Sequence, residues 1–209
     1  MMRIDLLKTT PARAGRYVVK FEDGSTARFY RQTVEDFGLY TGKELSDEEM
    51  TALTEAAGKM SAKMRAVRIV SATSVSKRDL EQRLVQKGED PDQAREAVQW
   101  MSDLSLLDDA KVAEQVVHRC IAKGYGFARA RQALYEKKVP KQYWDDALAD
   151  YPDLTEKIED FLRAKLGEAY GDRELKRTID ALLRRGHGYG QIRQALNRLR
   201  LDTEDYLED

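Results

Sequence analysis

The sequence contains few of the residues that build disulfide frameworks, metal centres or membrane spans. It has one cysteine, Cys120, and two histidines among 209 residues. A single cysteine excludes an internal disulfide framework and is typical of the cytoplasm. No spacing of histidine and cysteine suggests a zinc site. No apolar run approaches the ~20 residues that span a membrane, and the N-terminus lacks the apolar stretch of a secretory signal. We therefore expect a cytoplasmic protein that makes no membrane contact.

Catalytic signals and helix breakers are equally scarce. No cluster of titratable side chains suggests a nucleophile, a general base or a bound metal, so we expect neither an enzyme nor a cofactor or small-molecule substrate. Only four prolines occur, and aromatic residues make up 8% of the chain while charged residues make up 35%. This composition favours a polar, mainly helical protein.

What the chain does contain is an internal repeat. Residues 124–134 align with residues 186–196 at an offset of 62, without a gap. Both copies hold two glycines separated by one residue, then an aromatic residue, and later Arg-Gln-Ala-Leu. Leu84 occupies the position that Leu134 and Leu196 hold in these copies. A fixed offset predicts stacked supersecondary units, with function on an extended surface rather than in one pocket.

The first part of the chain has the period of strands. Residues 16–21 alternate in polarity, Asp23-Gly24 suits a tight turn, and Ala27 and Phe29 continue the alternation. We expect a small antiparallel element over residues 1–30, with a third strand over Arg3–Lys8 and a short helix near Thr33–Leu39.

From Ser46 onward the period is helical. Ser46 and Glu49 form a capping box for a long helix, whose predicted inner face comprises Met50, Leu53, Ala57, Met60, Met64, Val67 and Val70. Pro140 is expected to open a helix. Another long helix is expected over residues 154–183, with a break at Gly171, and a last short helix capped by Asp202.

These patterns predict a mainly α-helical fold of three tandem three-helix repeats that form a curved array, preceded by a small antiparallel β element. The expected boundaries are residues 1–45 for the β element, 46–105 for the first repeat, 106–151 for the second and 152–209 for the third.

Charge alternates along the chain in step with the repeat. Residues 59–88, 119–141 and 173–200 each carry a net charge of +6, and residues 89–114 and 142–160 each carry −6, although the whole chain carries only −1. Stacked units would place equivalent basic helices side by side. We therefore expect a basic stripe that meets a nucleic-acid backbone or an acidic protein groove. The alternative is that these charges are solvated or paired within the chain.

Four short segments occur in an order and spacing typical of one protein family. They are Ala66–Ser71 followed by Ser76–Leu80, Leu84 and Lys87-Gly88; Leu106–Asp109 followed by Val112-Ala113; Lys123–Gly126; and Leu183–Gly186. On these segments the chain resembles the RecX regulatory proteins of bacteria, over roughly residues 60–209. The resemblance implies a non-catalytic protein that binds the RecA recombinase or its filament on DNA. It also implies inhibition of RecA's ATP hydrolysis, strand exchange and coprotease activity, and hence regulation of DNA repair, recombination and the SOS response.

The candidate partner-binding residues are mostly cations at the ends of first helices and on middle helices. They are Arg78, Arg83, Lys123, Tyr125, Arg129, Arg131, Arg184, Arg185, His187, Arg193 and Arg198. Tyr125 and His187 occupy the same repeat position, and we expect both at the surface. Phe127 and Tyr189 also share a position, and we expect both in the core.

A second hypothesis is a DNA-binding module. Three-helix units with a glycine turn can resemble helix-turn-helix readers, whose second helix enters the major groove. The net charge near zero and the acidic blocks oppose this interpretation, but direct and weak DNA binding remains open.

Overall fold

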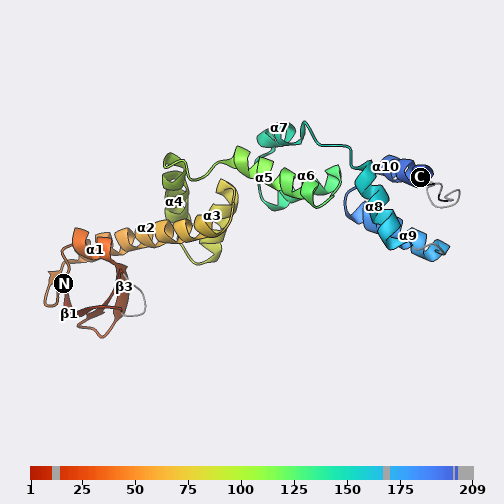
Figure 1. Cartoon of the computed structure of the whole chain (residues 1–209). Helices are drawn as coiled ribbons and strands as arrows, with labels where there is room; N and C mark the ends of the chain where they lie inside the picture. The colour runs from red at the N-terminus through yellow and green to blue at the C-terminus, as the bar shows by residue number, and fades with distance from the viewer. Residues whose placement is uncertain (11–14, 167–169, 200, 202–209) are drawn as a thin grey trace. The chain divides into compact units, whose positions relative to one another are not determined.

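The computed structural model describes residues 1–10, 15–166, 170–199 and 201 (Figure 1). The chain divides into two compact units, residues 1–107 (unit 1) and residues 108–209 (unit 2), and each is described by itself. Within the described part of the chain, no helix combines the length and the apolar character that crossing a membrane requires.

Unit 1 begins with a four-stranded antiparallel sheet. Its strands are β1 (Met2–Thr9), β2 (Arg16–Phe21), β3 (Thr26–Tyr30) and β4 (Glu44–Leu45), in the spatial order β3-β2-β1-β4. Gly24 has a φ of +83° in the turn between β2 and β3, a conformation that the missing Cβ permits. The predicted hairpin and third strand are confirmed, while the short two-residue strand β4 was not expected.

One face of the sheet is closed by helices. Ile4, Val19, Phe21 and Phe29 are buried in one apolar cluster, to which Leu53 of the following long helix contributes. A small sheet is marginal in water without such a cover, so the helix is part of its folding unit. The short helix α1 (Arg31–Asp36) begins two residues before the predicted segment and ends three residues before its end.

The long helix α2 (Asp47–Ala72) starts at the predicted capping box. The Ser46 hydroxyl accepts a hydrogen bond from the Glu49 amide at 3.1 Å. The Glu49 carboxylate in return accepts one from the Ser46 amide at 2.8 Å. Two amides of the first turn, which have no partner within the helix, are thereby satisfied.

The second half of α2 packs against α3 (Lys77–Gln86) and α4 (Pro91–Asp103) around a separate apolar cluster. The predicted inner face of α2 was wrong at Met64, which is exposed, and it missed Ala62 and Ala66, which are fully buried. Small side chains at these two positions let the neighbouring helices approach closely. The buried face of α2 therefore contains the two alanines, while Met64 lies outside it.

Unit 2 opens with a three-helix group. It comprises α5 (Asp109–Ala122), α6 (Phe127–Glu136) and α7 (Trp144–Leu148), with a 3-10 turn, η1 (Lys141–Tyr143), between α6 and α7. Asp108 caps α5 by accepting a hydrogen bond from the Lys111 amide. Trp144 is buried, and its indole nitrogen donates to the Val139 carbonyl at 2.9 Å. Pro140 precedes the 3-10 turn and not, as predicted, an α-helix directly.

The rest of unit 2 comprises α8 (Thr155–Lys165), α9 (Asp172–Arg184) and α10 (Tyr189–Arg198). The expected long helix over residues 154–183 is therefore two helices, and the predicted break is confirmed because Gly171 is the N-cap residue of α9. Ile158, Leu162, Leu182 and Ile192 are buried in the apolar cluster that these helices share. The expected short helix after Asp202 lies outside the described residues.

The fold class is thus confirmed as mainly helical with a small N-terminal antiparallel sheet. In the described part of the chain, four apolar clusters lie within residues 4–53, 62–107, 112–148 and 158–196. The expected boundaries of the repeats and their curved arrangement stay predictions.

The capping box gives a test of the fold. We expect Ser46→Ala to speed amide hydrogen exchange in the first turn of α2 about fivefold, because losing an N-cap side chain costs ~1 kcal/mol. Thr54→Ala is the control, since Thr54 is exposed within the same helix and its hydroxyl bonds only the Met50 carbonyl. Unchanged exchange in Ser46→Ala would show that the cap contributes nothing to this helix end.

Candidate partner-binding surface

The two copies of the glycine repeat touch each other in unit 2. The Gly126 amide donates a hydrogen bond to the Arg185 carbonyl at 2.8 Å, and the Ala128 amide donates to the Gly186 carbonyl at 3.3 Å. These amides belong to the first turn of α6, where helix amides have no partner within the helix. The turn that ends α9 therefore caps the start of α6. We call this contact the glycine junction.

The glycine junction depends on two missing side chains. A Cβ on Gly126 would lie 2.1 Å from the Gly186 carbonyl oxygen, and a Cβ on Gly186 would lie 2.3 Å from the Arg129 amide nitrogen. Gly186 also has a φ of +86°, which L-residues rarely adopt. Backbone atoms cannot move aside as a flexible side chain can, so both positions require glycine.

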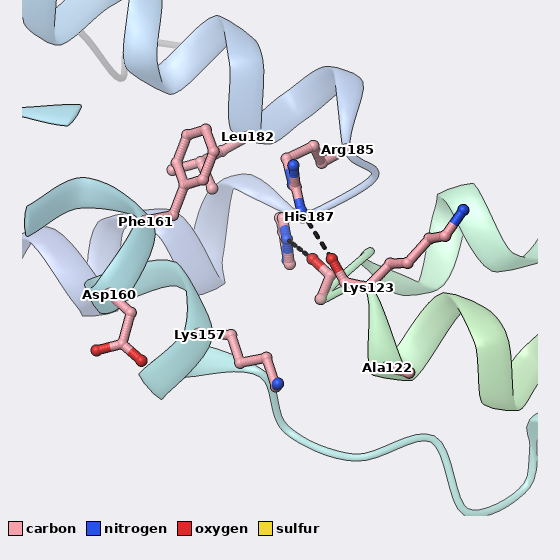
Figure 2. Close-up of a pocket in the computed structure, with 9 residues that line it drawn as sticks. Ala122, Lys123, Lys157, Asp160, Phe161, Leu182, Arg185 and His187 are labelled. Atoms are coloured by element: carbon pink, nitrogen blue, oxygen red, sulfur yellow. Dashed lines mark hydrogen bonds between the residues drawn. The ribbon is translucent and has the colours of Figure 1, made fainter. Parts of the chain in front are cut away.

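Arg185 is a structural part of this junction. Its guanidinium donates to the Lys123 carbonyl at 2.7 Å (Figure 2). It also stacks on the rings of Tyr125 and Phe161, at 5.1 Å and 5.0 Å from their centroids. The Tyr151 hydroxyl supports the same turn by donating to the Tyr125 carbonyl, and burial raises the pKa of Tyr151 to about 12. Two predicted partner-binding residues, Tyr125 and Arg185, thus contact each other.

His187 is buried, which corrects its predicted place at the surface. Only 4% of the residue is exposed, and its Nε2 lies 3.1 Å from the Gly124 carbonyl oxygen (Figure 2). Because a carbonyl only accepts, Nε2 carries the hydrogen, and the buried Nδ1 has no hydrogen-bond partner among the described residues. Burial lowers the pKa of His187, and the charge of Arg185 adds to this effect while the bond to Gly124 opposes it. A side chain that closes the contact between two turns cannot face solvent.

A cavity of about 320 Å³ lies beside the junction. Its charged lining residues are Lys123, Lys157, Asp160 and Arg185, and Phe161 forms an apolar wall (Figure 2). The Arg185 guanidinium is already occupied by the Lys123 carbonyl and two rings, and Asp160 offsets part of the positive charge. We therefore regard this cavity as part of the junction.

The helices α6 and α10 each expose an aromatic residue together with an arginine. Phe127 is 45% exposed and Tyr189 is 60% exposed, so their predicted burial in the core was wrong. Both are the first residue of their helix. Helix side chains tilt toward the N-terminus, so a residue in this first position has no preceding turn of its own helix to cover it. Each is followed four residues later by an exposed arginine, Arg131 or Arg193.

On α6 this surface is hollowed. A groove of about 440 Å³ is lined by Phe127, Arg131, Tyr135, Lys141 and Trp144, with Ala128 and Gln132 between them. Tyr135 is 67% exposed, and the Phe127 ring meets the ring of Tyr151 edge to face at 5.6 Å. We call the residues Phe127, Arg131 and Tyr135 of α6, with Tyr189 and Arg193 of α10, the aromatic–arginine face.

Three predicted cations are committed to ion pairs. Arg129 holds both carboxylate oxygens of Glu136, at 2.9 Å and 3.3 Å, and this bond lowers the pKa of Glu136. The other two pairs are Arg83 with Asp79 and Arg198 with Glu159. For these three arginines, the structure agrees with the alternative hypothesis, pairing within the chain, and not with a free basic stripe.

Four other predicted cations are more open. Arg78, Arg131 and Arg184 are exposed and form no ion pair within the part of the chain that the structure describes. Lys123 is also exposed, and its ammonium lies 5.9 Å from the centre of the Tyr125 ring. Among the same residues, no three His, Cys, Asp or Glu side chains gather as metal ligands would. Exposed rings and cations of this kind can contact a partner.

Comparison with known proteins places the chain in a family. Residues 108–148, which include α5, α6 and α7, match the family model described as RecX, second three-helix domain. The regulatory protein RecX of Xanthomonas axonopodis pv. citri (strain 306) is 32% identical over 145 residues, which are 68% of this chain and 87% of that protein. The chain belongs to the RecX family.

Other RecX proteins agree with this assignment. The regulatory protein RecX of Vibrio campbellii (strain ATCC BAA-1116) is 29% identical over 141 residues, covering 66% of this chain and 91% of that protein. A crystal structure of a regulatory protein RecX has a TM-score of 0.61 at 21% identity and covers 93% of this chain and all of that one. RecX from Lactobacillus salivarius has a TM-score of 0.58 at 20% identity, over 69% of this chain and 98% of that one. These two structures support the fold.

Because of the glycine junction, we expect alanine substitutions at two equivalent repeat positions to have unequal effects on stability. We expect Gly126→Ala to destabilise unit 2 by about 1–3 kcal/mol, the range for overpacking, because the new methyl group meets backbone. Gly188→Ala is the matched control, since Gly188 holds the same repeat position and an added Cβ there meets nothing within 4 Å. The measurement is urea unfolding followed by circular dichroism. Equal stability of the two variants would contradict the junction.

His187 predicts a dependence of the junction on pH. Because its folded-state pKa is lowered, the unfolded chain takes up the proton first as the pH falls. The part of the free energy of unfolding that depends on neutral His187 is fully present above about pH 6.5, the ordinary histidine pKa. It is lost as the pH falls from there through the lowered folded-state pKa. We expect His187→Gln to reduce the loss of stability between pH 7.5 and pH 5, measured by urea unfolding. His118→Gln, at an exposed position on α5, should retain it.

Proposed function

We propose that this protein binds RecA, or the RecA filament on DNA, and limits its ATP hydrolysis, strand exchange and coprotease activity. Membership of a family named as regulatory proteins supports this function, and RecA is the partner that the RecX resemblance implies. The protein would act in the cytoplasm, without catalysis of its own, through a contact that changes the state of the recombinase.

The aromatic–arginine face is our candidate for the contact, and it is the observation that carries the proposal. Tyrosine and arginine are enriched among the residues that contribute most to protein interfaces. Phe127 and Tyr135 border a groove on α6, and Tyr189 with Arg193 repeats the pattern on α10. The glycine junction bonds the turn between α9 and α10 to the start of α6. The helices α6 and α10 therefore belong to one unit, and one partner could contact both.

The helix-turn-helix hypothesis receives less support. Such readers place the N-terminal residues of the second helix against base edges in the major groove. In α6 the backbone of the first turn is covered, since the Gly126 and Ala128 amides bond the turn after α9. This geometry opposes major-groove reading by α6, and it leaves contact with the phosphate backbone by other parts of the chain open.

The proposal predicts that RecA inhibition is lost when an arginine of the face is reversed in charge or when an aromatic ring of the face is removed. We expect Arg131→Glu, and separately Tyr189→Ala, to weaken binding to RecA filaments about 10-fold or more, because interface residues of these types often contribute more than ~1.4 kcal/mol. The measurements are filament binding and RecA ATP hydrolysis on single-stranded DNA across a salt series.

The control for charge is Lys176→Glu, at an exposed position on α9 outside the groove. Arg129→Glu is avoided because it breaks the ion pair with Glu136. If Arg131→Glu and Tyr189→Ala inhibit RecA as well as the unaltered protein does, the contact lies elsewhere. If the unaltered protein binds bare DNA tightly and leaves RecA's ATP hydrolysis unchanged, the proposed function is wrong.

A further inference from the structure

Unit 1 contains a cationic pocket, which shares no residue with the aromatic–arginine face. It lies between α2 and α3 and has a volume of about 330 Å³. Four of its lining residues carry positive charge and none carries negative charge, and the remaining lining residues are Ile69, Ala72 and Thr73. The four cations are Arg65, Arg68, Arg83 and Lys87.

Two of the arginines are held in place by buried carboxylates behind them. The Arg65 Nε bonds Glu89, which also accepts a hydrogen bond from the Ser61 hydroxyl at 3.0 Å. The Arg83 Nη2 lies 2.9 Å from Asp79. Both carboxylate residues are more than nine-tenths buried. A guanidinium has five N–H donors, so each arginine keeps donors beyond those that its carboxylate uses.

Among the described residues, the other two cations form no ion pair. Arg68 donates to the Tyr30 hydroxyl and to the Met64 carbonyl, both at 3.2 Å, and both partners are neutral. Lys87 is exposed at the end of α3 and forms no ion pair among the described residues. Two positive charges therefore remain in excess at one opening, beside two arginines whose geometry is already fixed.

The simplest alternative is that these cations only stabilise the end of a helix. Lysine and arginine near a helix C-terminus interact favourably with the helix dipole, which accounts for Arg83 and Lys87 on α3. It accounts less well for Arg65 and Arg68, which precede the last turn of α2 and line the same opening. Convergence from two elements is the pattern of a binding site.

We infer that this pocket binds a phosphate group. Arginine forks match phosphate oxygens in pairs, and a tetrahedral phosphate can accept from more than one fork, whereas one fork already satisfies a carboxylate. The excess of two positive charges suits a phosphate dianion or neighbouring phosphodiesters. The group could come from a nucleic-acid backbone or from a free polyphosphate. The inference goes beyond the proposed function, and it does not depend on RecA as the partner.

The test uses the full chain with the double variant Arg68→Gln, Lys87→Gln. These changes leave the pairs Arg65–Glu89 and Arg83–Asp79 intact, so the fold should be retained. The control is the double variant Lys8→Gln, Lys20→Gln, which removes the same charge from exposed positions on β1 and β2. The probes are a fluorescent oligo(dT) 20-mer and inorganic pyrophosphate, and no RecA is present.

We expect the oligonucleotide to bind the unaltered chain and the control alike. In the pocket variant the slope of log affinity against log salt should fall by about 1.4, because each contact to single-stranded DNA contributes about 0.7. Pyrophosphate should shift the arginine Nε signals of Arg65 and Arg83 in proton–nitrogen NMR spectra. Pyrophosphate shifts without oligonucleotide binding would assign the site to a free polyphosphate.

Three outcomes would overturn the inference. One is binding of neither probe by the unaltered chain. Another is an equal salt slope for the pocket variant and the control. The third is a set of pyrophosphate shifts that leaves Arg65 and Arg83 unchanged. Because the assay contains no RecA, none of these outcomes bears on the proposed regulation of RecA.

Discussion

Unit 2 depends on one close backbone contact, the glycine junction. The turn after α9 supplies carbonyls to the first amides of α6. The two backbone segments approach so closely that a methyl group on Gly126 or Gly186 would overlap main-chain atoms. Arg185 and His187 close the contact by bonding the carbonyls of Lys123 and Gly124. The repeat is therefore more than a copied motif, because its two copies bind each other.

This junction separates structural residues from candidates for partner binding. Arg185, His187 and Tyr125 hold the two turns together, and Arg129 is paired with Glu136 beside them. The residues left outward on the same helices are rings and arginines four residues apart, Phe127 with Arg131 and Tyr189 with Arg193. The hydrogen bonds between the turn after α9 and the start of α6 keep both pairs within unit 2.

The sequence was sufficient to predict the helical class, the N-terminal hairpin, the capping box at Ser46 and the break at Gly171, because each depends on local signals. It was not sufficient for the surface. His187 was placed outside and Phe127 inside, since periodicity says which side of a helix a residue lies on but not what covers it. The cover of His187 comes from a turn 63 residues away, and Phe127 escapes the core because it is the first residue of its helix. The pairing of Arg83 with Asp79 depends on tertiary structure in the same way.

The most direct test of the account is hydroxyl-radical footprinting of the protein, free and bound to RecA filaments. The account predicts that oxidation of Phe127, Tyr135 and Tyr189 falls on binding, because these exposed rings form the contact. Tyr40, which is exposed in unit 1 and lies outside the proposed face, should be oxidised equally in both states. Equal oxidation of the three unit 2 rings in the free and bound protein would contradict the aromatic–arginine face as the site of contact.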